Sequence, residues 1–307
     1  MKNALVSGAA GFVGSHLVDR LLEEGFAVIG VDNLITGEEE NLNSAKRNSK
    51  FRFLDLDVVT EIPDLGMKFD YIFHAASPAS PPKYFEYPIE TMMVNSIGTK
   101  NLLDLAEMNN ARFIFFSTSE VYGDPLEHPQ RESYWGNVNP IGPRSIYDEA
   151  KRFGEALVAQ YVREKKANAG IIRIFNTYGP RLDPHDGRVV STFVRQAING
   201  EALTINGDGN QTRSFCYISD LIDGIFKMAE SNEFGPINLG NPNEMTLNEL
   251  VKEIGKLLSK NLNTVNLPEL KDDPVRRKPD ISLAKEKLGW EPKVPLTQGL
   301  QILINSQ

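Results

Sequence analysis

The sequence predicts an α/β fold built on a doubly wound parallel sheet, with a smaller α/β portion toward its C-terminal end. Two observations predict it. Short apolar runs alternate with amphipathic stretches of helical length, and small or acidic residues follow the apolar runs. Because strands that alternate with helices form right-handed crossovers, consecutive strands should lie parallel in one sheet. The expected strands are at residues 4–6, 27–32, 51–56, 71–74, 112–116 and 170–175.

Three glycines follow the first apolar run, and a helical pattern follows the glycines. In a strand–turn–helix unit, Gly8 would allow the tight turn, Gly11 the approach of a pyrophosphate, and Gly14 close packing of helix and strand. The second run ends in Asp32, whose carboxylate can accept hydrogen bonds from ribose hydroxyls and would repel a 2'-phosphate. The order of these features predicts a Rossmann-type unit that binds NAD in preference to NADP.

Polar and small residues also follow the later strands. Asp57 comes after the third strand, residues 75–77 after the fourth, residues 117–120 after the fifth, and Asn176 after the sixth. In open parallel sheets, ligands bind beyond the carboxyl ends of the strands. We therefore expect these segments to line one ligand site together with the glycine loop.

Tyr147 and Lys151 are the strongest candidates for acid–base chemistry. Their spacing of four puts both side chains on one face of a helix. A nearby ammonium favours a phenolate, so Lys151 should lower the pKa of Tyr147 from its usual value of about 10. The ordinary alternative is an exposed helix with an unremarkable Tyr and Lys. The glycine loop upstream is what favours the catalytic interpretation.

Composition limits the class of protein. The chain has 307 residues, 41% of them hydrophobic, and a net charge of −8, which fits a soluble globular protein and argues against nucleic acid or an anionic membrane as the main partner. Its single cysteine, Cys216, cannot form an internal disulfide, so a reducing, cytoplasmic location is expected. No signal peptide or apolar run long enough for a membrane span is expected. No metal site is expected, because metal-ligand spacing is absent among His16, His74, His128 and His185.

The second half of the chain differs from the first in amino-acid composition. We expect residues 1–175 to form the NAD-binding domain, joined by a returning strand near residues 236–240, and residues 176–307 to form mainly a substrate domain. A helix should begin at Thr246, with Glu249 completing a capping box. Arginines close to glycine and proline turns favour an anionic substrate, and they include Arg181, Arg188, Arg213 and Arg277.

Taken together, these motifs resemble the extended short-chain dehydrogenase/reductases that act on nucleotide sugars, over essentially the whole chain. Within that group the sequence is most similar to the UDP-glucuronate decarboxylases. The segments that carry the resemblance are residues 8–14, 32–37, 76–82, 117–124, 134–144, 173–181, 186–191 and 272–280.

Ser119 separates two branches of this group. The related dehydratases place an acidic Asp at this position, where it expels the C6 hydroxyl of the sugar. Ser119 cannot supply a proton as a carboxylic acid does, and it adds no negative charge beside a substrate carboxylate. The pair Ser119–Glu120 therefore favours loss of carbon dioxide over loss of water.

The resemblance implies a set of site residues. The implied catalytic residues are Thr118, Ser119, Glu120, Tyr147, Lys151 and Arg277. The implied cofactor residues, besides Tyr147 and Lys151, are Gly8, Gly11, Phe12, Val13, Gly14, Asp32, Asn33, Thr36, Gly37, Asp57, Val58, Ala75, Ser77, Thr177 and Arg188. The implied substrate residues are Tyr84, Asn176, Arg181, Val189, Arg213 and Arg277.

The resemblance also implies a reaction. Tyr147 would take the C4 hydroxyl proton of UDP-glucuronate while hydride passes to NAD, carbon dioxide would leave the resulting β-keto acid, and re-reduction at C4 would give UDP-xylose. Tyr147 and Thr118 would steady the enolate oxygen. Three alternatives stay open: a 4,6-dehydratase, a 4-epimerase, or a non-catalytic NAD-binding regulator. The sequence leaves undecided the base (uracil or thymine), the release of the 4-keto intermediate, and the group that protonates C5.

Finally, the resemblance implies a homodimer. The helix expected from about residue 89 and the Tyr147 helix both carry apolar residues beyond a single stripe, and two such helices from each subunit would form a four-helix interface. The apolar residues that support this interface are Met92, Leu103, Phe153, Leu157 and Tyr161.

Overall fold

A computed structural model describes residues 1–268 and 276–307, so part of the predicted motif at residues 272–280 lies outside the described residues. Its main feature is a seven-stranded sheet in which every pairing is parallel, which confirms the predicted Rossmann-type α/β fold. In spatial order the strands are β11 (Ile237–Leu239), β6 (Ala169–Ile174), β5 (Arg112–Thr118), β4 (Tyr71–His74), β1 (Asn3–Ser7), β2 (Ala27–Asp32) and β3 (Phe51–Asp55).

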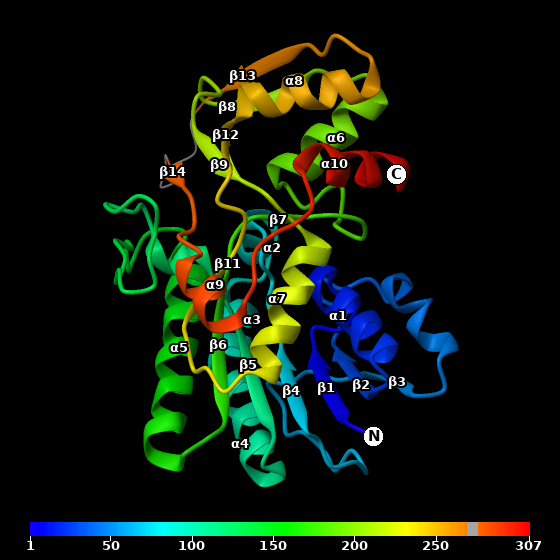
Figure 1. Ribbon diagram of the computed structural model, residues 1–307, viewed down its shortest axis with the longest axis vertical. Coiled ribbons are helices and arrows are strands. Elements are labelled where there is room, and N and C mark those ends of the chain that lie inside the picture. The colour runs from blue at the N-terminus through cyan, green and yellow to red at the C-terminus, as the bar shows by residue number, and fades with distance from the viewer. Residues whose placement is uncertain (269–275) are drawn as a thin grey trace.

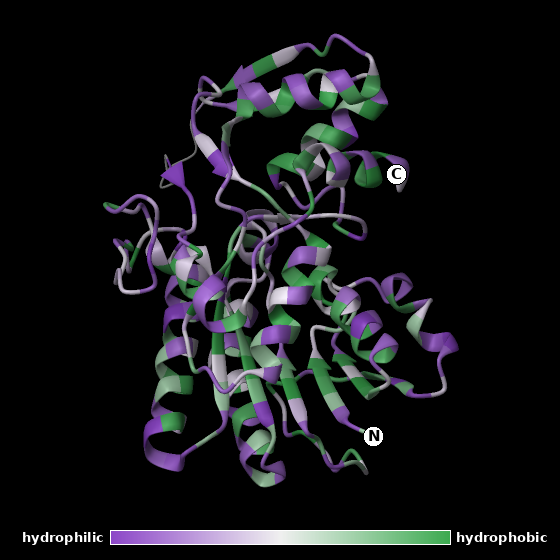
Figure 2. Ribbon diagram, viewed as in Figure 1, coloured by the Kyte–Doolittle hydropathy of each residue, from purple (hydrophilic) through white to green (hydrophobic). Residues whose placement is uncertain are grey.

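Helices cover both faces of this sheet, and this explains why its strands read as continuous apolar runs. On β1, Ala4 and Val6 belong to one hydrophobic cluster, while Leu5 between them belongs to another. The first cluster includes α1 (Phe12–Glu23) and α7 (Ile218–Glu230), and the second includes α4 (Thr99–Asn109) and α5 (Ser145–Lys165). Figure 2 shows the resulting concentration of hydrophobic residues along the strands.

The long helix expected from about residue 89 is present over residues 88–109, but it is not α-helical throughout. It consists of α3 (Pro88–Met93), a π-helical segment η3 (Val94–Gly98) and α4. Asn95, in the π-helical segment, donates hydrogen bonds from Nδ2 to Ser77 Oγ (2.9 Å) and to the carbonyl of Thr91 (2.8 Å). Apolar periodicity cannot reveal this local change of pitch, because π segments are typically single turns within otherwise regular helices.

The remaining elements gather beyond the carboxyl end of the sheet, in the upper part of Figure 1. The helix α8 begins with the predicted capping box: Thr246 and Glu249 each bond the other's backbone N–H. The larger elements here are α6 (Val189–Asn199), β8 (Leu203–Asn206), α8 (Leu247–Leu258), β13 (Thr264–Leu267) and α10 (Leu296–Asn305). The smaller ones are β7 (Thr177–Tyr178), β9 (Thr212–Ser214), β10 (Cys216–Tyr217) and β12 (Glu244–Thr246).

One short strand returns from this region toward the sheet. β14 (Arg276–Arg277) pairs in parallel with β9, and Arg277 is the register partner of Arg213. The chain then enters α9 (Ser282–Leu288), which contacts β11 at the edge of the sheet. This path carries Arg277 to the fifth strand, more than 150 residues earlier in the chain, where it meets Glu120.

Candidate active site

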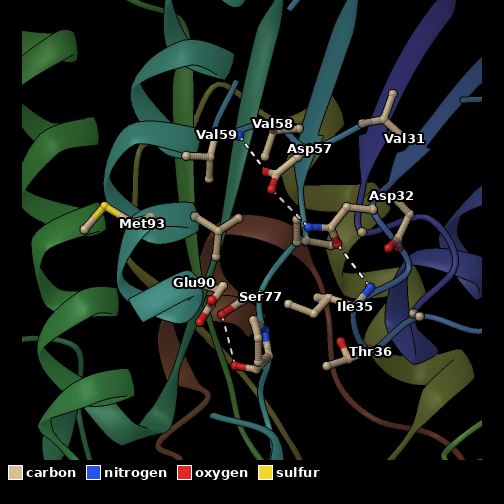
Figure 3. Close-up of a pocket in the computed structure, with 18 of the residues that line it drawn as sticks. Val31, Asp32, Ile35, Thr36, Asp57, Val58, Val59, Ser77, Glu90 and Met93 are labelled. Carbon is tan, nitrogen blue, oxygen red and sulfur yellow. Dashed lines mark hydrogen bonds between the residues drawn. The ribbon is translucent and has the colours of Figure 1, made fainter. Parts of the chain in front are cut away.

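A pocket of about 320 Å³ lies beyond the carboxyl ends of β1, β2 and β4 (Figure 3). Most of the predicted cofactor residues line it, although they come from four separate stretches of the chain. These are Gly8, Gly11, Asp32, Asn33, Thr36, Gly37, Asp57, Val58, Ala75 and Ser77. The sheet topology therefore brings together what the sequence places up to seventy residues apart.

The glycine loop has the close packing that the motif predicts. Gly8 has φ +72°, and a Cβ there would lie 2.7 Å from the backbone of Ala75 and Ala76. A Cβ on Gly14 would lie only 1.9 Å from the carbonyl oxygen of Gly8. The loop thus leaves its backbone open to the pocket at the start of α1, the arrangement that suits a pyrophosphate.

Asp32 closes another side of the pocket with its carboxylate held in place. Oδ2 accepts a hydrogen bond from the backbone N–H of Ala10 and Oδ1 from that of Leu34, both at 2.9 Å. Burial raises the pKa of Asp32, and these two backbone donors act against the rise. A Cβ on Gly37 would lie 3.0 Å from either carboxylate oxygen, so the glycine keeps this side of Asp32 open. The pocket therefore fits a ribose and pyrophosphate.

Seven predicted cofactor residues lie outside the set that lines this pocket: Phe12, Val13, Gly14, Tyr147, Lys151, Thr177 and Arg188. Phe12 and Val13 begin α1 and pack against the hydrophobic core. Arg188 reaches the same place from the segment before α6, because its guanidinium carbon lies 6.0 Å from the centre of the Phe12 ring. Thr177 is buried on β7, with its hydroxyl donating to the carbonyl of Phe175 (2.9 Å).

The Tyr147–Lys151 pair lies on α5 as expected, but its electrostatics differ from the prediction. Lys151 donates from Nζ to the carbonyl of Phe116 (2.8 Å), and burial lowers its pKa to about 7. Burial also raises the pKa of Tyr147, and the charge of Glu120 adds to the rise. The predicted fall in the pKa of Tyr147 is thus wrong for these residues by themselves. Desolvation of both groups outweighs their proximity.

Glu120 is held between two arginines. It accepts hydrogen bonds from both terminal nitrogens of Arg277, including Nη2 to Oε2 at 2.9 Å, and a short one from Arg144. Burial would raise the pKa of Glu120, but the charges of Arg277 and then Arg144 outweigh it and lower the pKa. Glu120 is therefore an ionised carboxylate inside the protein. Ser119 is buried beside it.

Two residues that sequence analysis did not select also belong to this cluster. Arg144 is the residue before α5, one turn ahead of Tyr147, and Asp148 directly follows Tyr147. Helical spacing from Tyr147 was the signal that could have indicated Arg144. Tyr84, from α2 (Pro81–Glu86), stacks on Tyr147 with ring centres 5.4 Å apart. Its buried hydroxyl has no hydrogen-bond partner among the described residues.

The other predicted substrate residues lie around the upper lobe, by which we mean the elements gathered beyond the carboxyl end of the sheet (Figure 1). Arg213 is buried on β9, opposite Arg277, while Val189 is the first residue of α6. Asn176 accepts a hydrogen bond at its carbonyl from the backbone N–H of Cys216 (2.9 Å). Arg181 is tied to α1, because it pairs with Asp19 at 2.6 Å.

Residues 4–240 match the model of the NAD dependent epimerase/dehydratase family. The chain belongs to this family. NAD is accordingly its cofactor, as the glycine loop and Asp32 indicate.

The names of individual relatives are more specific than the name of the family. The chain is 53% identical over 300 residues to UDP-glucuronic acid decarboxylase 2 of Arabidopsis thaliana, covering 98% of this chain and 67% of that protein. It is 50% identical to UDP-glucuronic acid decarboxylase 1 of Danio rerio, with 97% and 71% covered.

Solved structures of the family agree with the fold. A UDP-glucuronic acid 4-epimerase from Bacillus cereus, in complex with UDP-glucuronic acid and NAD, superposes with a TM-score of 0.89 at 30% identity, covering 99% of this chain and 98% of that one. A dTDP-glucose 4,6-dehydratase from Streptomyces venezuelae also gives 0.89, at 26% identity, with 99% and 96% covered.

Two further searches of the described residues bear on the site. Within residues 1–268 and 276–307, no group of three or more His, Cys, Asp and Glu side chains could hold a metal ion. No helix in the same residues combines the length and apolarity that crossing a membrane requires.

We predict that Gly14→Ala will sharply weaken NAD binding, because its Cβ would collide with the Gly8 carbonyl and push the loop out of shape. Gly11→Ala should have a smaller effect, since its Cβ would lie 3.2 Å from the same oxygen. Titration with NAD, monitored by calorimetry, tests this order. Equal affinities in the two variants and the wild type would show that the loop tolerates the added carbon.

Proposed function

We propose that this protein converts UDP-glucuronate to UDP-xylose, keeping NAD bound through the cycle. The observation that carries the proposal is the buried guanidinium of Arg277, only 5% exposed, which pairs with Glu120 just after the end of β5. Arg144 pairs with the same carboxylate, so two guanidinium groups face the single charge of Glu120 and leave net positive charge for the carboxylate of a glucuronate. The names of the relatives at 50–53% identity support the same substrate and reaction.

The first step oxidises C4 of the sugar. NAD, when bound, supplies the acceptor for the C4 hydride and the donor that later restores it. Tyr147 takes the proton of the C4 hydroxyl, and Thr118 hydrogen-bonds the Tyr147 side chain. Because burial opposes loss of the Tyr147 proton, a nearby positive charge is needed. Lys151, whose Nζ is 5.7 Å from the centre of the Tyr147 ring, supplies part of it when protonated.

The second step is the loss of carbon dioxide. A ketone at C4 is β to the C6 carboxylate, so the electrons of the breaking bond can move onto the ketone oxygen. In this proposal, Tyr147 and Thr118 donate hydrogen bonds to that oxygen, a preorganised stabilisation. Arg277 orients the carboxylate, with charge-assisted hydrogen bonds worth ~1.5–3 kcal/mol.

Ser119 favours this reaction over the dehydratase alternative. Elimination of a C6 hydroxyl needs an acid that can give up a proton, and a serine hydroxyl cannot do so near neutral pH. Glu120 is ionised, so it cannot act as that acid either. The 4-epimerase alternative shares the first step and differs only in how the ketone is reduced, so it is separated by product analysis.

The remaining site residues complete the proposal. The ten predicted residues that line the pocket hold the cofactor, joined by Phe12, Val13, Gly14, Thr177 and Arg188. The nucleotide-sugar lies toward the upper lobe, which follows the proposed division into residues 1–175 and 176–307. Its proposed contacts are Tyr84, Asn176, Arg181, Val189, Arg213 and Arg277.

A cytoplasmic location is part of the proposal. Its support is the single cysteine, Cys216, which is buried and free. Such a thiol persists in a reducing compartment. Fractionation of cells that make the protein at native levels, followed by immunoblotting, would contradict the proposal if the protein were found outside the cytoplasm.

Incubating the purified protein with UDP-glucuronate and NAD tests the function directly. Mass spectrometry should find a product lighter by one carbon dioxide, with the sugar identified as xylose by NMR. A C4 epimer of the same mass as the substrate would favour the epimerase alternative. With UDP-glucose or dTDP-glucose, a 4-keto-6-deoxy product would favour the dehydratase.

We expect Tyr147→Phe to lower turnover by about 10²–10⁴-fold, the usual loss for one acid–base group, while NAD stays bound. Tyr161→Phe is the matched control on the same helix, because the Tyr161 hydroxyl bonds Asp104 away from the site. It should keep near-normal turnover. Steady-state rates and the NAD content of each purified variant test this expectation. A near-normal rate for Tyr147→Phe would remove Tyr147 from the mechanism.

Arg277→Gln should reduce turnover of UDP-glucuronate strongly and leave UDP affinity nearly unchanged, because the guanidinium faces Glu120 and the sugar end. The neighbouring Arg276, which is exposed, gives the control Arg276→Gln. Turnover assays and UDP titrations separate the outcomes. Equal losses in both would make Arg277 a nucleotide clamp, and no loss in either would make it an ordinary loop cation.

We also propose a homodimer through α3 and α5. Exposed apolar side chains support it: Ile89 is 61%, Met92 40% and Phe153 53% exposed. Two of the residues that the sequence predicts for this interface do not belong to it. Leu103 and Tyr161 are buried within the subunit, where Tyr161 bonds Asp104 (2.6 Å).

Phe153→Glu should convert the dimer to monomer, because it places a charge in an apolar interface. Ile198→Glu, on the exposed side of α6, is the control and should leave the dimer intact. Sedimentation velocity at micromolar concentration measures both. A wild type that sediments as a monomer would contradict the proposal.

A further inference from the structure

One buried acid beside the site has no role in the mechanism above. Asp148 follows Tyr147 on α5 and is 5% exposed. Its Oδ2 is 4.0 Å from Nε of Arg144, and its buried Oδ1 has no hydrogen-bond partner among the described residues. An unpaired buried carboxylate oxygen is costly, and the cost falls when the carboxyl group holds a proton.

The surroundings of Asp148 oppose its ionisation. Burial raises its pKa, and the negative charge of Glu120 raises it further, against the effects of Arg144 and Arg277. The pKa of the adjacent Glu120 moves the other way. Such a divergence separates a charged carboxylate from a proton-holding acid. The titratable or charged groups that act on Asp148 are Tyr84, Glu120, Arg144, Tyr147, Glu149 and Arg277.

Decarboxylation consumes one proton. The C5–C6 bond breaks, carbon dioxide leaves, and the electron pair that remains must finally bind a proton at C5. Glu120 has none to give while it accepts hydrogen bonds from Arg144 and Arg277. The guanidinium groups keep their protons, since arginine is effectively always charged. A buried site therefore needs a separate proton store.

We propose that Asp148 is this store: it takes up a proton as the carboxylated sugar binds, and gives it up when C5 is protonated. The inference rests on the proposed function. During the step, the O–H bond of Asp148 breaks, the C5–H bond forms, and the C4 ketone reforms from the enolate. Asp148 is left as a carboxylate, and a solvent proton restores it before the next cycle.

In this proposal the hydroxyl of Tyr84 relays the proton. It too is buried without a hydrogen-bond partner among the described residues, and it is carried by the ring that stacks on Tyr147. A phenol can accept a hydrogen at its oxygen while donating its own. Asp148 therefore acts as a proton-storing residue, and it need not touch the sugar.

Uptake of the proton on binding follows from charge. A glucuronate carboxylate at Arg277 adds one negative charge to the group that already surrounds Asp148. A like charge nearby disfavours ionisation, so binding should raise the pKa of Asp148 further. A sugar without the carboxylate should not have this effect.

Calorimetry tests this uptake. UDP-glucuronate is titrated into NAD-bound Tyr147→Phe protein, which stops turnover, in two mildly alkaline buffers of different ionisation enthalpy. The difference between the buffers should correspond to uptake approaching about one proton per site. UDP-xylose should give almost none, and neither sugar should give uptake in Tyr147→Phe/Asp148→Asn protein. Equal uptake with the two sugars, or uptake that survives Asp148→Asn, would overturn the proposal.

Turnover gives a second test. Asp148→Asn keeps the shape of the side chain but holds no exchangeable acid, so UDP-xylose formation should fall by about 10²-fold or more. The wild-type rate should fall as pH rises through the Asp148 pKa, because the ionised form holds no proton, and the variant should keep only the alkaline limb that loss of the Lys151 proton causes. Glu164→Gln is the matched control, since Glu164 lies near the far end of the same helix, where it accepts a hydrogen bond from Gln160 (3.4 Å). It should behave as wild type.

The two proposals fail separately. Wild-type protein that forms no UDP-xylose would contradict the proposed function, whereas proton uptake is measured on binding and needs no product. If the wild type makes UDP-xylose and folded Asp148→Asn protein makes it at a near-normal rate, the decarboxylase stands and the role of Asp148 is overturned.

Discussion

The ion pair between Glu120 and Arg277 is the interaction on which the active site depends. It joins the end of the fifth strand to a short strand that lies more than 150 residues later in the chain. Arg144 binds the same carboxylate from the start of α5. Breaking a buried pair by removing one partner typically costs ~3–5 kcal/mol, because the other charge is left uncompensated. The pair therefore closes the upper lobe onto the sheet and fixes the charge at the site.

Two neighbouring buried carboxyl groups in the site differ in their tendency to ionise. Glu120 has two guanidinium partners and stays ionised, while Asp148, one helix residue after Tyr147, has an unpaired oxygen and a raised pKa. Lys151 and Tyr147 are both pushed toward their neutral forms. The cost of desolvation thus favours the neutral form of each buried group, and the two arginines keep Glu120 charged in spite of it.

The cofactor pocket shows the complementary principle, in which topology gathers local motifs. Gly8, Asp32, Asp57 and Ser77 each end a strand or follow one, and parallel pairing sets those ends along one edge. A buried network extends the same organisation. Arg173 on β6 pairs with Glu155 on α5 (2.7 Å) and donates to the Tyr122 hydroxyl (3.0 Å). These contacts therefore fix the position of α5, which carries Tyr147, against β6 of the sheet.

The sequence by itself determined the sheet, the glycine loop, Asp32, the Tyr147–Lys151 face and the capping box at Thr246, because each depends on residues close in the chain. Tertiary structure alone decided the π-helical segment at 94–98, the pairing of Glu120 with Arg277 and Arg144, and the burial of Asp148. It also made burial the main influence on the pKa of Tyr147, which rises where the local spacing predicts a fall. Desolvation and the charges of distant segments depend on which parts of the chain pack together, and local spacing carries no record of that packing.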